Sequence, residues 1–404
     1  MRIERAVVAL AAALCAYSAS ADGPHRSGPD QAAVPDRLID RLAATRPGPN
    51  PYYAVTHLTP HRDDDPVVVA FRDTLQPPWR PGRPFGTYDV LARHRDLGGV
   101  LGLAYDPERG ALLAAAFATR MFGGDPLGPA GPGAIYRIDL GPGSLRALAT
   151  LDVGGLPRSV SDVFTNNLGD IDLAEDGRTL FATNLYDRRL YRISATSGAI
   201  LGSFAHGAAG EPWAANARPF GLGLQGEWLY HGVVDSREDG SLPGAPGAHV
   251  YRSRHDGGGM EEVAAFDLSG LARPWSENFS RSSRQLLVAD IELGDDGALV
   301  IGLRDRSGLL EYDSDGGAFL LGAVPAGGGL STGLLPLQSY SLQGHLAAVP
   351  RADKVVTLEC NDGCGASTAA VWLDASTGAL GGPADGREHL FGEAHYGGDI
   401  ETLC

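Results

Sequence analysis

The sequence has few cysteines, almost no lysine and no long hydrophobic runs. Its 404 residues include 4 cysteines, and Lys354 is the only lysine, so arginine supplies nearly all of the positive charge. The net charge is −16, which argues against nucleic acid as a partner, because a phosphate backbone requires clustered lysine and arginine. The longest apolar run has about 12 residues, too few to cross a bilayer core of ~30 Å. We therefore expect no transmembrane segment.

The sequence also lacks the short motifs of common catalytic sites. Its 11 histidines show no HxH or HExxH spacing, and there is no GxSxG elbow, phosphate-binding loop or dinucleotide fingerprint. Aromatic residues make up only 7% of the chain, whereas 56 glycines and 27 prolines make it rich in turns. This composition favours many short strands over long helices.

The N-terminus has the pattern of an export signal. Arg2 and Arg5 precede an apolar stretch at residues 6–17, and residues 19–21 offer small side chains for cleavage. The alternatives are an uncleaved anchor, for which the apolar stretch is too short, and lipidation at Cys15, which lacks a small residue before it. We predict a cleaved signal peptide and an exported protein, whether periplasmic, secreted or at the cell surface.

Three cysteines would remain after cleavage, namely Cys360, Cys364 and Cys404. An exported chain is exposed to oxidising conditions, which permit disulfides. The "CNDGC" segment places Cys360 and Cys364 across a tight turn, and Cys404 could pair with either one. The three are disulfide candidates whose pairing stays open.

A phrase of about two strands and an acidic turn recurs along the chain. It reads "GDIDLAEDGRTLFATNLYDRRLYRIS" at residues 169–194 and "ADIELGDDGALVIGLRDRSGLLEYD" at 289–313. Short apolar runs separated by turns that end in glycine are typical of antiparallel hairpins. A hairpin that recurs in this way indicates a repeat architecture.

The spacing of the repeat predicts a β-propeller. First strands centre near six residues at intervals of about 50 to 70 residues, the size of one propeller blade. These centres are Leu103, Ile171, Leu222, Ile291, Leu346 and Ile400. We therefore predict an all-β fold with six blades. Strand-like segments at 66–75 and 87–96 would complete the blade of the C-terminal strand and close the ring, whereas a seventh blade from residues 50–95 is the alternative. The expected division of the chain is a signal peptide at 1–21, a flexible segment at 22–50 and the propeller at 51–404.

Several phrases carry a resemblance to a known family. "LGGVLGLAYDPERGALLAAAF", "GAIYRIDL", "LGDIDLAEDGRTLFATNLYDRRLYRI", "VADIELGDDGALVIGLRDRSG" and "GGDIETLC" resemble a β-propeller module of bacterial secreted and surface proteins. That module often lies beside domains of the serine-aspartate-repeat adhesin B type. More distantly, the chain resembles six-bladed propellers with NHL-type repeats. The resemblance implies a propeller fold and an exported location, and it implies no catalytic residues.

Acidic pairs occupy three of the first strands. The pairs are Asp170 with Asp172, Asp290 with Glu292, and Asp399 with Glu401. Residues two apart in a strand point to the same side, so these carboxylates could meet near a central channel and bind Ca²⁺ or Mg²⁺. The alternative is structural, because an aspartate in each repeat could accept backbone N–H bonds from a neighbouring blade. We favour the structural role and keep Ca²⁺ as a possible cofactor.

Arginines follow four of the second strands, and polar or aromatic residues fill the longer loops. The arginines could pair with nearby aspartates or together bind an anionic ligand such as a carboxylated sugar. The candidate ligand-binding residues are Arg120, Arg188, Arg237, Arg306, Asn166, Asn167, Trp275 and Asn278.

Two functions fit these patterns. The first is a secreted, monomeric scaffold that binds a protein or glycan ligand through one face, since propeller function usually lies in such loops. The second is a Ca²⁺-dependent hydrolase or lactonase with its site in the central channel. That alternative would use Asn166, Asn167, Asp170 and Asp290, because six-bladed propellers resembling the gluconolactonase family hold Ca²⁺ with acidic and asparagine ligands.

Overall fold

The computed structural model describes most of the chain from residue 51 onward. The described residues are 51–58, 63–72, 88–119, 127–141, 143–159, 161–277, 284–294, 299–306, 319–324, 342–349, 354–361, 367–374, 388–390 and 397–403. Several predictions fall outside them: the signal peptide at 1–21, the segment at 22–50, Arg120, Asn278, Cys364, Cys404 and the side chain of Cys360. The disulfide therefore stays a prediction.

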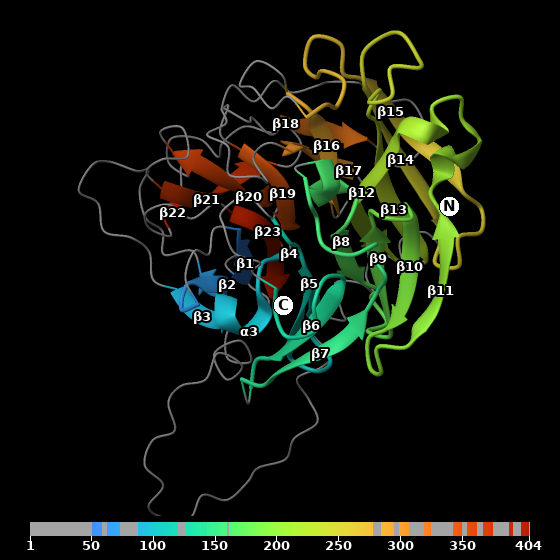
Figure 1. The fold of residues 1–404 in the computed structure, drawn as a ribbon. Coiled ribbons are helices and arrows are strands. Elements are labelled where there is room, and N and C mark those ends of the chain that lie inside the picture. Colours follow the sequence, from blue (N-terminus) through green and yellow to red (C-terminus); the bar gives the residue numbers. More distant parts are fainter. Residues whose placement is uncertain are drawn as a thin grey trace, which may run out of the picture.

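The described strands form antiparallel sheets arranged around a common centre (Figure 1). Five sheets have four strands each. One sheet joins the two ends of the described chain and contains β23 (Gly397–Leu403), β1 (Tyr52–His57), β2 (Pro66–Arg72) and β3 (Tyr88–Arg93). The next two sheets along the chain contain β4 (Val100–Asp106), β5 (Ala111–Ala116), β6 (Ala134–Asp139) and β7 (Leu145–Thr150), and then β8 (Leu168–Leu173), β9 (Thr179–Asn184), β10 (Arg189–Ser194) and β11 (Ile200–Ala205). The other two contain β12 (Ala217–Gln225), β13 (Trp228–Asp235), β14 (Gly247–Arg254) and β15 (Glu261–Asp267), and then β19 (Leu342–Ala348), β20 (Lys354–Asn361), β21 (Ser367–Asp374) and β22 (Glu388–Leu390). A further sheet has three described strands, β16 (Leu286–Leu293), β17 (Leu299–Asp305) and β18 (Phe319–Val324).

This arrangement is a single all-β propeller with five four-stranded blades. The predicted fold class is confirmed, whereas the three-stranded sheet stands where a sixth full blade was expected. Short helices interrupt the strands at α3 (His94–Leu97) and at three 3-10 turns, Ser161–Phe164, Gly207–Gly210 and Ala214–Asn216. None of the helices in the described part of the chain is long and apolar enough to span a membrane.

Each predicted first-strand centre lies in an edge strand of its own sheet. Those strands are β4, β8, β12, β16, β19 and β23. The hairpin of β8 and β9 illustrates the cause: the N–H of Gly177 donates to Ala174 O at 2.8 Å, and the φ of Gly177 is 63°. A side chain other than glycine is strained at such a φ, so the glycine of "AEDG" fixes the turn and with it the register.

The two ends of the described chain share one sheet. β23 pairs with β1, and β1 pairs with β2. The segments at 66–75 and 87–96 were predicted to join the C-terminal strand, and they do so through β1, a strand that the sequence did not reveal. The alternative of a seventh blade from residues 50–95 is wrong, because β1 to β3 belong to the sheet of β23.

The edge strands contact one another in chain order, from β4 through β8, β12, β16 and β19 to β23, and β23 also contacts β4. The apolar core lies between neighbouring sheets. Val68 of β2 belongs to the same cluster as Leu103 of β4, and Ile171 of β8 to the same cluster as Leu113 of β5. The strands that carry the predicted acidic pairs therefore lie at the inner edge of the sheets.

Candidate functional site: an acidic central channel

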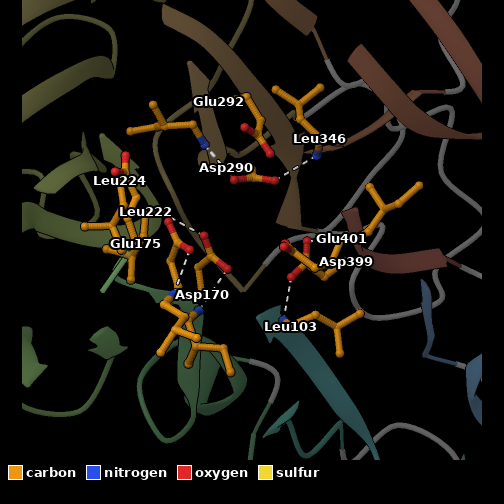
Figure 2. A pocket seen from close by; sticks show the side chains of 15 residues that line it. Leu103, Asp170, Glu175, Leu222, Leu224, Asp290, Glu292, Leu346, Asp399 and Glu401 are labelled. Carbon is orange, nitrogen blue, oxygen red and sulfur yellow. Dashed lines mark hydrogen bonds between the residues drawn. The ribbon is translucent and has the colours of Figure 1, made fainter. Parts of the chain in front are cut away.

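The three acidic pairs converge on one cavity of about 150 Å³ (Figure 2). They come from β8, β16 and β23, which alternate with β4, β12 and β19 among the inner strands. Apolar residues of these alternating strands, Leu103, Leu222 and Leu346, complete the wall. The convergence predicted from the repeat is therefore present, although non-adjacent strands supply the acids.

The repeat explains how so many carboxylates fit into one channel. The position before each strand centre carries, in chain order, Gly102, Asp170, Gly221, Asp290, His345 and Asp399. The position after it carries Ala104, Asp172, Gly223, Glu292, Ala347 and Glu401. Acidic strands thus alternate with strands that carry small residues. A Cβ atom on Gly221 would lie 2.6 Å from the backbone nitrogen of Asp290, so the small residues permit close approach of the acidic strands.

Asp170, Asp290 and Asp399, here called the latch aspartates, fasten neighbouring sheets. Oδ1 of Asp170 accepts the N–H of Ile171 at 2.8 Å, and Oδ2 accepts the N–H of Leu222 at 2.8 Å. The other two repeat this pattern: Asp290 accepts from Ile291 at 2.7 Å and Leu346 at 2.8 Å, and Asp399 from Ile400 at 2.8 Å and Leu103 at 2.6 Å. The structural role predicted for these aspartates is confirmed, since each joins its own strand to the next one along the ring.

The second tier of carboxylates, Asp172, Glu292 and Glu401, lies two residues further along each strand. Burial raises the pKa of Asp172 to about 7 and that of Glu292 to about 8. The pKa of Glu401 is raised well above its usual value, first by burial and then by the charges of Asp172 and Glu292. Part of the second tier therefore stays protonated at neutral pH. The burial of these groups is incomplete, because each keeps some exposed surface facing the channel.

The acidic character extends beyond the first cavity. Glu292 and Glu401 also line a second cavity of about 280 Å³, together with Glu108 and Glu175. Glu175 is exposed and lies in the "AEDG" turn between β8 and β9. The channel is thus lined by carboxylates from the latch aspartates to this end of the inner strands.

A histidine and an arginine, neither of them predicted as site residues, adjoin the latch aspartates. His345 is fully buried on β19, and its Nδ1 lies 3.2 Å from Oδ1 of Asp399. Arg304 of β17 is also buried and donates from Nη1 to Gly398 O at 3.3 Å. Burial lowers the pKa of Arg304 to about 9, although the charge of Asp399 opposes this shift. Aligning "GHL" at 344–346 with "GDI" at 398–400 would have drawn attention to His345.

The predicted arginines do not form a ring around one opening. Nε of Arg237 pairs with Oδ2 of Asp235 at 2.6 Å, which confirms the predicted aspartate–arginine pair for this hairpin. Arg188 instead donates to Ala215 O at 2.7 Å, while Asp187 accepts from the hydroxyl of Tyr191. The prediction of an Asp187–Arg188 pair is wrong, because Tyr191 and a neighbouring backbone N–H take up that carboxylate.

Arg306 and Trp275 do lie together, in a cavity of about 320 Å³ here called the Trp275 pocket. The guanidinium of Arg306 stacks at 4.5 Å from the ring centroid of Trp275 and at 5.0 Å from that of Phe164. Nη2 of Arg306 also donates to Gln285 Oε1 at 2.6 Å. The pocket is lined by Ser161, Phe164, Thr165, Arg218, Glu238, Trp275, Ser276, Glu277 and Arg306.

The Trp275 pocket lies by the starts of the inner strands, at the opposite end from Glu175 and Glu401. Its central polar feature is an ion pair between Arg218 and Glu238, which the sequence did not reveal. Arg188 adjoins this pair, and its pKa is lowered by burial and by the charge of Arg218. A short sequence motif could not have predicted this ion pair. Arg218 lies at the start of β12, whereas Glu238 follows the end of β13.

The remaining predicted ligand residues have structural hydrogen bonds. Asn167 is buried; its side chain accepts from the N–H of Ala118 at 2.8 Å and donates to Ala118 O and Val163 O, both at 3.0 Å. Oδ1 of Asn166 accepts from Thr165 Oγ1 at 2.8 Å. Nε1 of Trp275 donates to Leu286 O at 3.0 Å. Of these three residues, Trp275 lines the Trp275 pocket.

No family model matches the chain. Colossin-D of Dictyostelium discoideum is 26% identical over 285 residues, which is 62% of this chain. The match spans 29% of the length of Colossin-D.

Two solved structures illustrate the similarity in fold. A chain from the crystal structure of a nidogen/laminin complex has a TM-score of 0.46 at 13% identity, covering 88% of this chain and 98% of that one. A putative 6-phosphogluconolactonase from Bacteroides uniformis also has a TM-score of 0.46, at 14% identity, covering 88% of this chain and 100% of that one. The chain is similar to these proteins, and its fold is that of a β-propeller.

Proposed function

We propose that this protein is an exported, monomeric β-propeller that acts as a binding scaffold, with the Trp275 pocket as its ligand site. We further infer six blades in a closed ring, with the sheet of β16, β17 and β18 as the sixth. The contact of β23 with both β19 and β4 supports this ring, as does the pairing of β23 with β1. The export signal expected at residues 1–21 and the resemblance to bacterial surface modules support a location outside the cytoplasm.

The observation that carries the proposal is the balance of groups around the Trp275 pocket. Two arginines, Arg218 and Arg306, face two glutamates, Glu238 and Glu277, so the charged lining sums to zero. Hydroxyl-bearing residues and two aromatic residues complete the wall. Such a set offers both donors and acceptors beside an apolar surface, which suits the hydroxyls and ring of a sugar.

Of the protein and glycan ligands considered, this pocket favours a glycan. Its volume of about 320 Å³ lies near the lower end of the usual range for small-molecule sites, ~300–1,000 Å³. A concavity of that size accepts one or two sugar units more readily than a protein surface. Because the lining is neutral overall, we expect an uncharged saccharide to bind better than a carboxylated one.

An oligosaccharide array probed with the mature chain tests the proposal, followed by calorimetric titration of the sugars that bind. We expect neutral oligosaccharides to bind, and Glu238→Gln to weaken binding about tenfold, since an ionised acceptor contributes ~1.5–3 kcal/mol to a hydrogen bond. Glu261→Gln is the matched control, because Glu261 pairs with Arg252 at 2.6 Å on outer strands away from the pocket.

Three results would contradict the proposal. The first is an array on which no saccharide binds. The second is preferential binding of uronic acids, which would show that the charge balance does not govern selection. The third is equal affinity of the wild type and Glu238→Gln, which would place the ligand elsewhere on the propeller.

The alternative of a Ca²⁺-dependent hydrolase has less support. It required Asn166, Asn167, Asp170 and Asp290 as ligands, yet the side-chain amide of Asn167 is hydrogen-bonded to the backbone of Ala118 and Val163. Neither Asn166 nor Asn167 lines the cavity on which the carboxylates converge.

A further inference from the structure

Three side chains of metal-ligand type meet inside the channel, in a place independent of the Trp275 pocket. One donor atom each from Asp290, His345 and Asp399 lies within 4.8 Å of the others, and all three residues are buried. They come from β16, β19 and β23, and β19 contacts each of the other two strands. The fold thus brings together an imidazole and two carboxylates at a spacing that one metal ion could bridge.

His345 is the part of this cluster that the fold does not require. At the same position of the repeat, β4 and β12 carry Gly102 and Gly221, and the acidic strands carry the latch aspartates. His345 alone places a large side chain on a strand that does not carry acids. The imidazole is fully buried; its Nδ1 lies 3.2 Å from Oδ1 of Asp399, and among the described residues its Nε2 has no hydrogen-bond partner. A buried polar atom is costly unless it is satisfied, so Nε2 calls for a partner.

The two aspartates can accept a metal without giving up their structural role. Each carboxylate oxygen has two acceptor sites, and each oxygen of Asp290 and Asp399 uses one for a backbone N–H. A second site on each oxygen is left for a cation. These hydrogen bonds also fix the carboxylates in place, so the ligands are held in position before an ion arrives.

The acidic lining of the cavity favours a cation over an anion. Asp170, the second tier and Glu175 add five acidic groups to the same cavity, beside one buried guanidinium, Arg304. Asp290 and Asp399 also line the cavity of about 150 Å³, through which an ion can enter.

The donor set selects the kind of ion. Ca²⁺ and Mg²⁺ prefer oxygen ligands alone, whereas an imidazole nitrogen with carboxylates suits divalent transition metals. We propose that Asp290, His345 and Asp399 bind one divalent transition-metal ion, with Mn²⁺ and Zn²⁺ as the ions that fit this donor set.

The test uses the mature chain, stripped with a chelator and titrated calorimetrically with MnCl₂, ZnCl₂ and CaCl₂ in separate experiments. We expect one Mn²⁺ or Zn²⁺ per chain and at least tenfold weaker binding of Ca²⁺. His345→Gln should weaken Mn²⁺ and Zn²⁺ binding at least tenfold, because glutamine keeps polarity and approximate size but loses the imidazole nitrogen. His249→Gln is the control; it removes an imidazole on β14 that pairs with Glu262 and does not line this cavity, and it should change affinity less than about threefold.

A spectroscopic measurement keeps the test decisive if His345→Gln does not fold. Electron spin echo spectra of the Mn²⁺-loaded wild type should show coupling to one ¹⁴N nucleus of the imidazole. The proposal is overturned if neither Mn²⁺ nor Zn²⁺ binds, if His345→Gln binds them as the wild type does, or if the ¹⁴N coupling is missing. Preferential Ca²⁺ binding that survives His345→Gln would assign the cation to the second tier instead.

Discussion

The carboxylate of Asp170 accepts a hydrogen bond from the backbone N–H of Leu222 at 2.8 Å, and this bond joins the inner strands of two different sheets. The same carboxylate also accepts from Ile171 in its own strand. One side chain thus satisfies two buried N–H groups on either side of a sheet boundary. Latches of this kind recur at Asp290 and Asp399, so the stability of the ring depends on individual carboxylates.

Asp170→Ala should therefore destabilise the whole propeller. It leaves the N–H groups of Ile171 and Leu222 without their acceptor, and we expect a loss of about 2–4 kcal/mol in the free energy of unfolding. Burial, and then repulsion from Asp290 and Asp399, raises the pKa of Asp170, and relief of these two costs will offset part of this loss. Urea denaturation measures the change. Asp176→Ala, in an exposed turn where Asp176 accepts from the N–H of Arg178, should cost less than about 1 kcal/mol; equal losses for both variants would refute the latch.

Gly221→Ala tests the close approach of β12 to β16. A Cβ atom there would lie 2.6 Å from the backbone nitrogen of Asp290, and backbone cannot move aside as a flexible side chain can. We expect a loss of about 1–3 kcal/mol in the free energy of unfolding, typical of overpacking. Gly210→Ala is the control, since a Cβ atom on Gly210 meets nothing within 4 Å. A thermal unfolding midpoint unchanged by Gly221→Ala would show that the strands can separate at little cost.

Removing a second-tier charge should stabilise the protein at neutral and alkaline pH. Asp172 has a pKa of about 7 in the folded protein, raised from 3.8. Between these two values the unfolded chain releases a proton that the folded protein retains, so stability falls as pH rises from about 4 to about 7. Asp172→Asn removes this loss, because asparagine stays neutral and its oxygen can still accept from Leu173.

The measurement for Asp172→Asn is urea denaturation at pH 5 and pH 8 with a chelator present. We expect the variant to be about 1–3 kcal/mol more stable than the wild type at pH 8, with a smaller difference at pH 5. The channel solvent reduces this gain below the full value implied by the shift. A variant less stable than the wild type at pH 8 would mean that the ionised carboxylate makes a favourable contact.

Two buried histidines should make the protein sensitive to acid. Burial lowers the pKa of His206 to about 4 and that of His231 to about 3, from 6.5. Below pH 6.5 the unfolded chain binds protons that these histidines do not bind in the folded protein, so their contribution to stability is intact above pH 6.5 and falls as the pH drops toward 4. We expect the two histidines to contribute a loss of about 1–3 kcal/mol between pH 7 and pH 5, opposed by the second-tier carboxylates, whose raised pKa values act in the other direction.

His231→Gln should remove part of that acid sensitivity. Glutamine can still accept the hydrogen bond that Gly207 donates to Nε2 of His231 at 3.3 Å, but it cannot be protonated. Denaturation curves at pH 7 and pH 5 provide the comparison. His249→Gln, which replaces the partner of Glu262, serves as the control and should retain the acid sensitivity; an unaltered pH response in His231→Gln would assign that sensitivity to other groups.

The sequence predicted the propeller and its acidic channel because both follow from a repeat. Asp170, Asp290 and Asp399 occupy the same position in their repeats, so each has the same kind of neighbours and makes the same two backbone hydrogen bonds. The residues that break the repeat were not predictable in this way. His345 is a candidate metal ligand because it lies beside Asp399, and that proximity follows from the contact between β19 and β23.

Contacts between residues far apart in the sequence also could not be predicted from the repeat. Arg218 and Glu238 meet because one begins a first strand and the other follows a second strand, which a linear pattern does not reveal. The strand β1 was missed for a similar reason, since its partner β23 lies at the far end of the chain. The prediction that the arginines together bind one ligand was wrong for a related reason, since equivalent positions in different hairpins have different neighbours.

The pairing of β1 with β23 cannot form until the ribosome has made both strands, which lie far apart in the sequence. At roughly 5–20 residues per second, about 350 residues are made between these two strands, which takes roughly 20–70 s. Until then the edge of β1 that β23 will cover has no backbone partner, and an open edge invites pairing with another chain. A newly made β23 from one molecule could fill the gap in another, so crowded nascent chains should be prone to domain-swapped assembly.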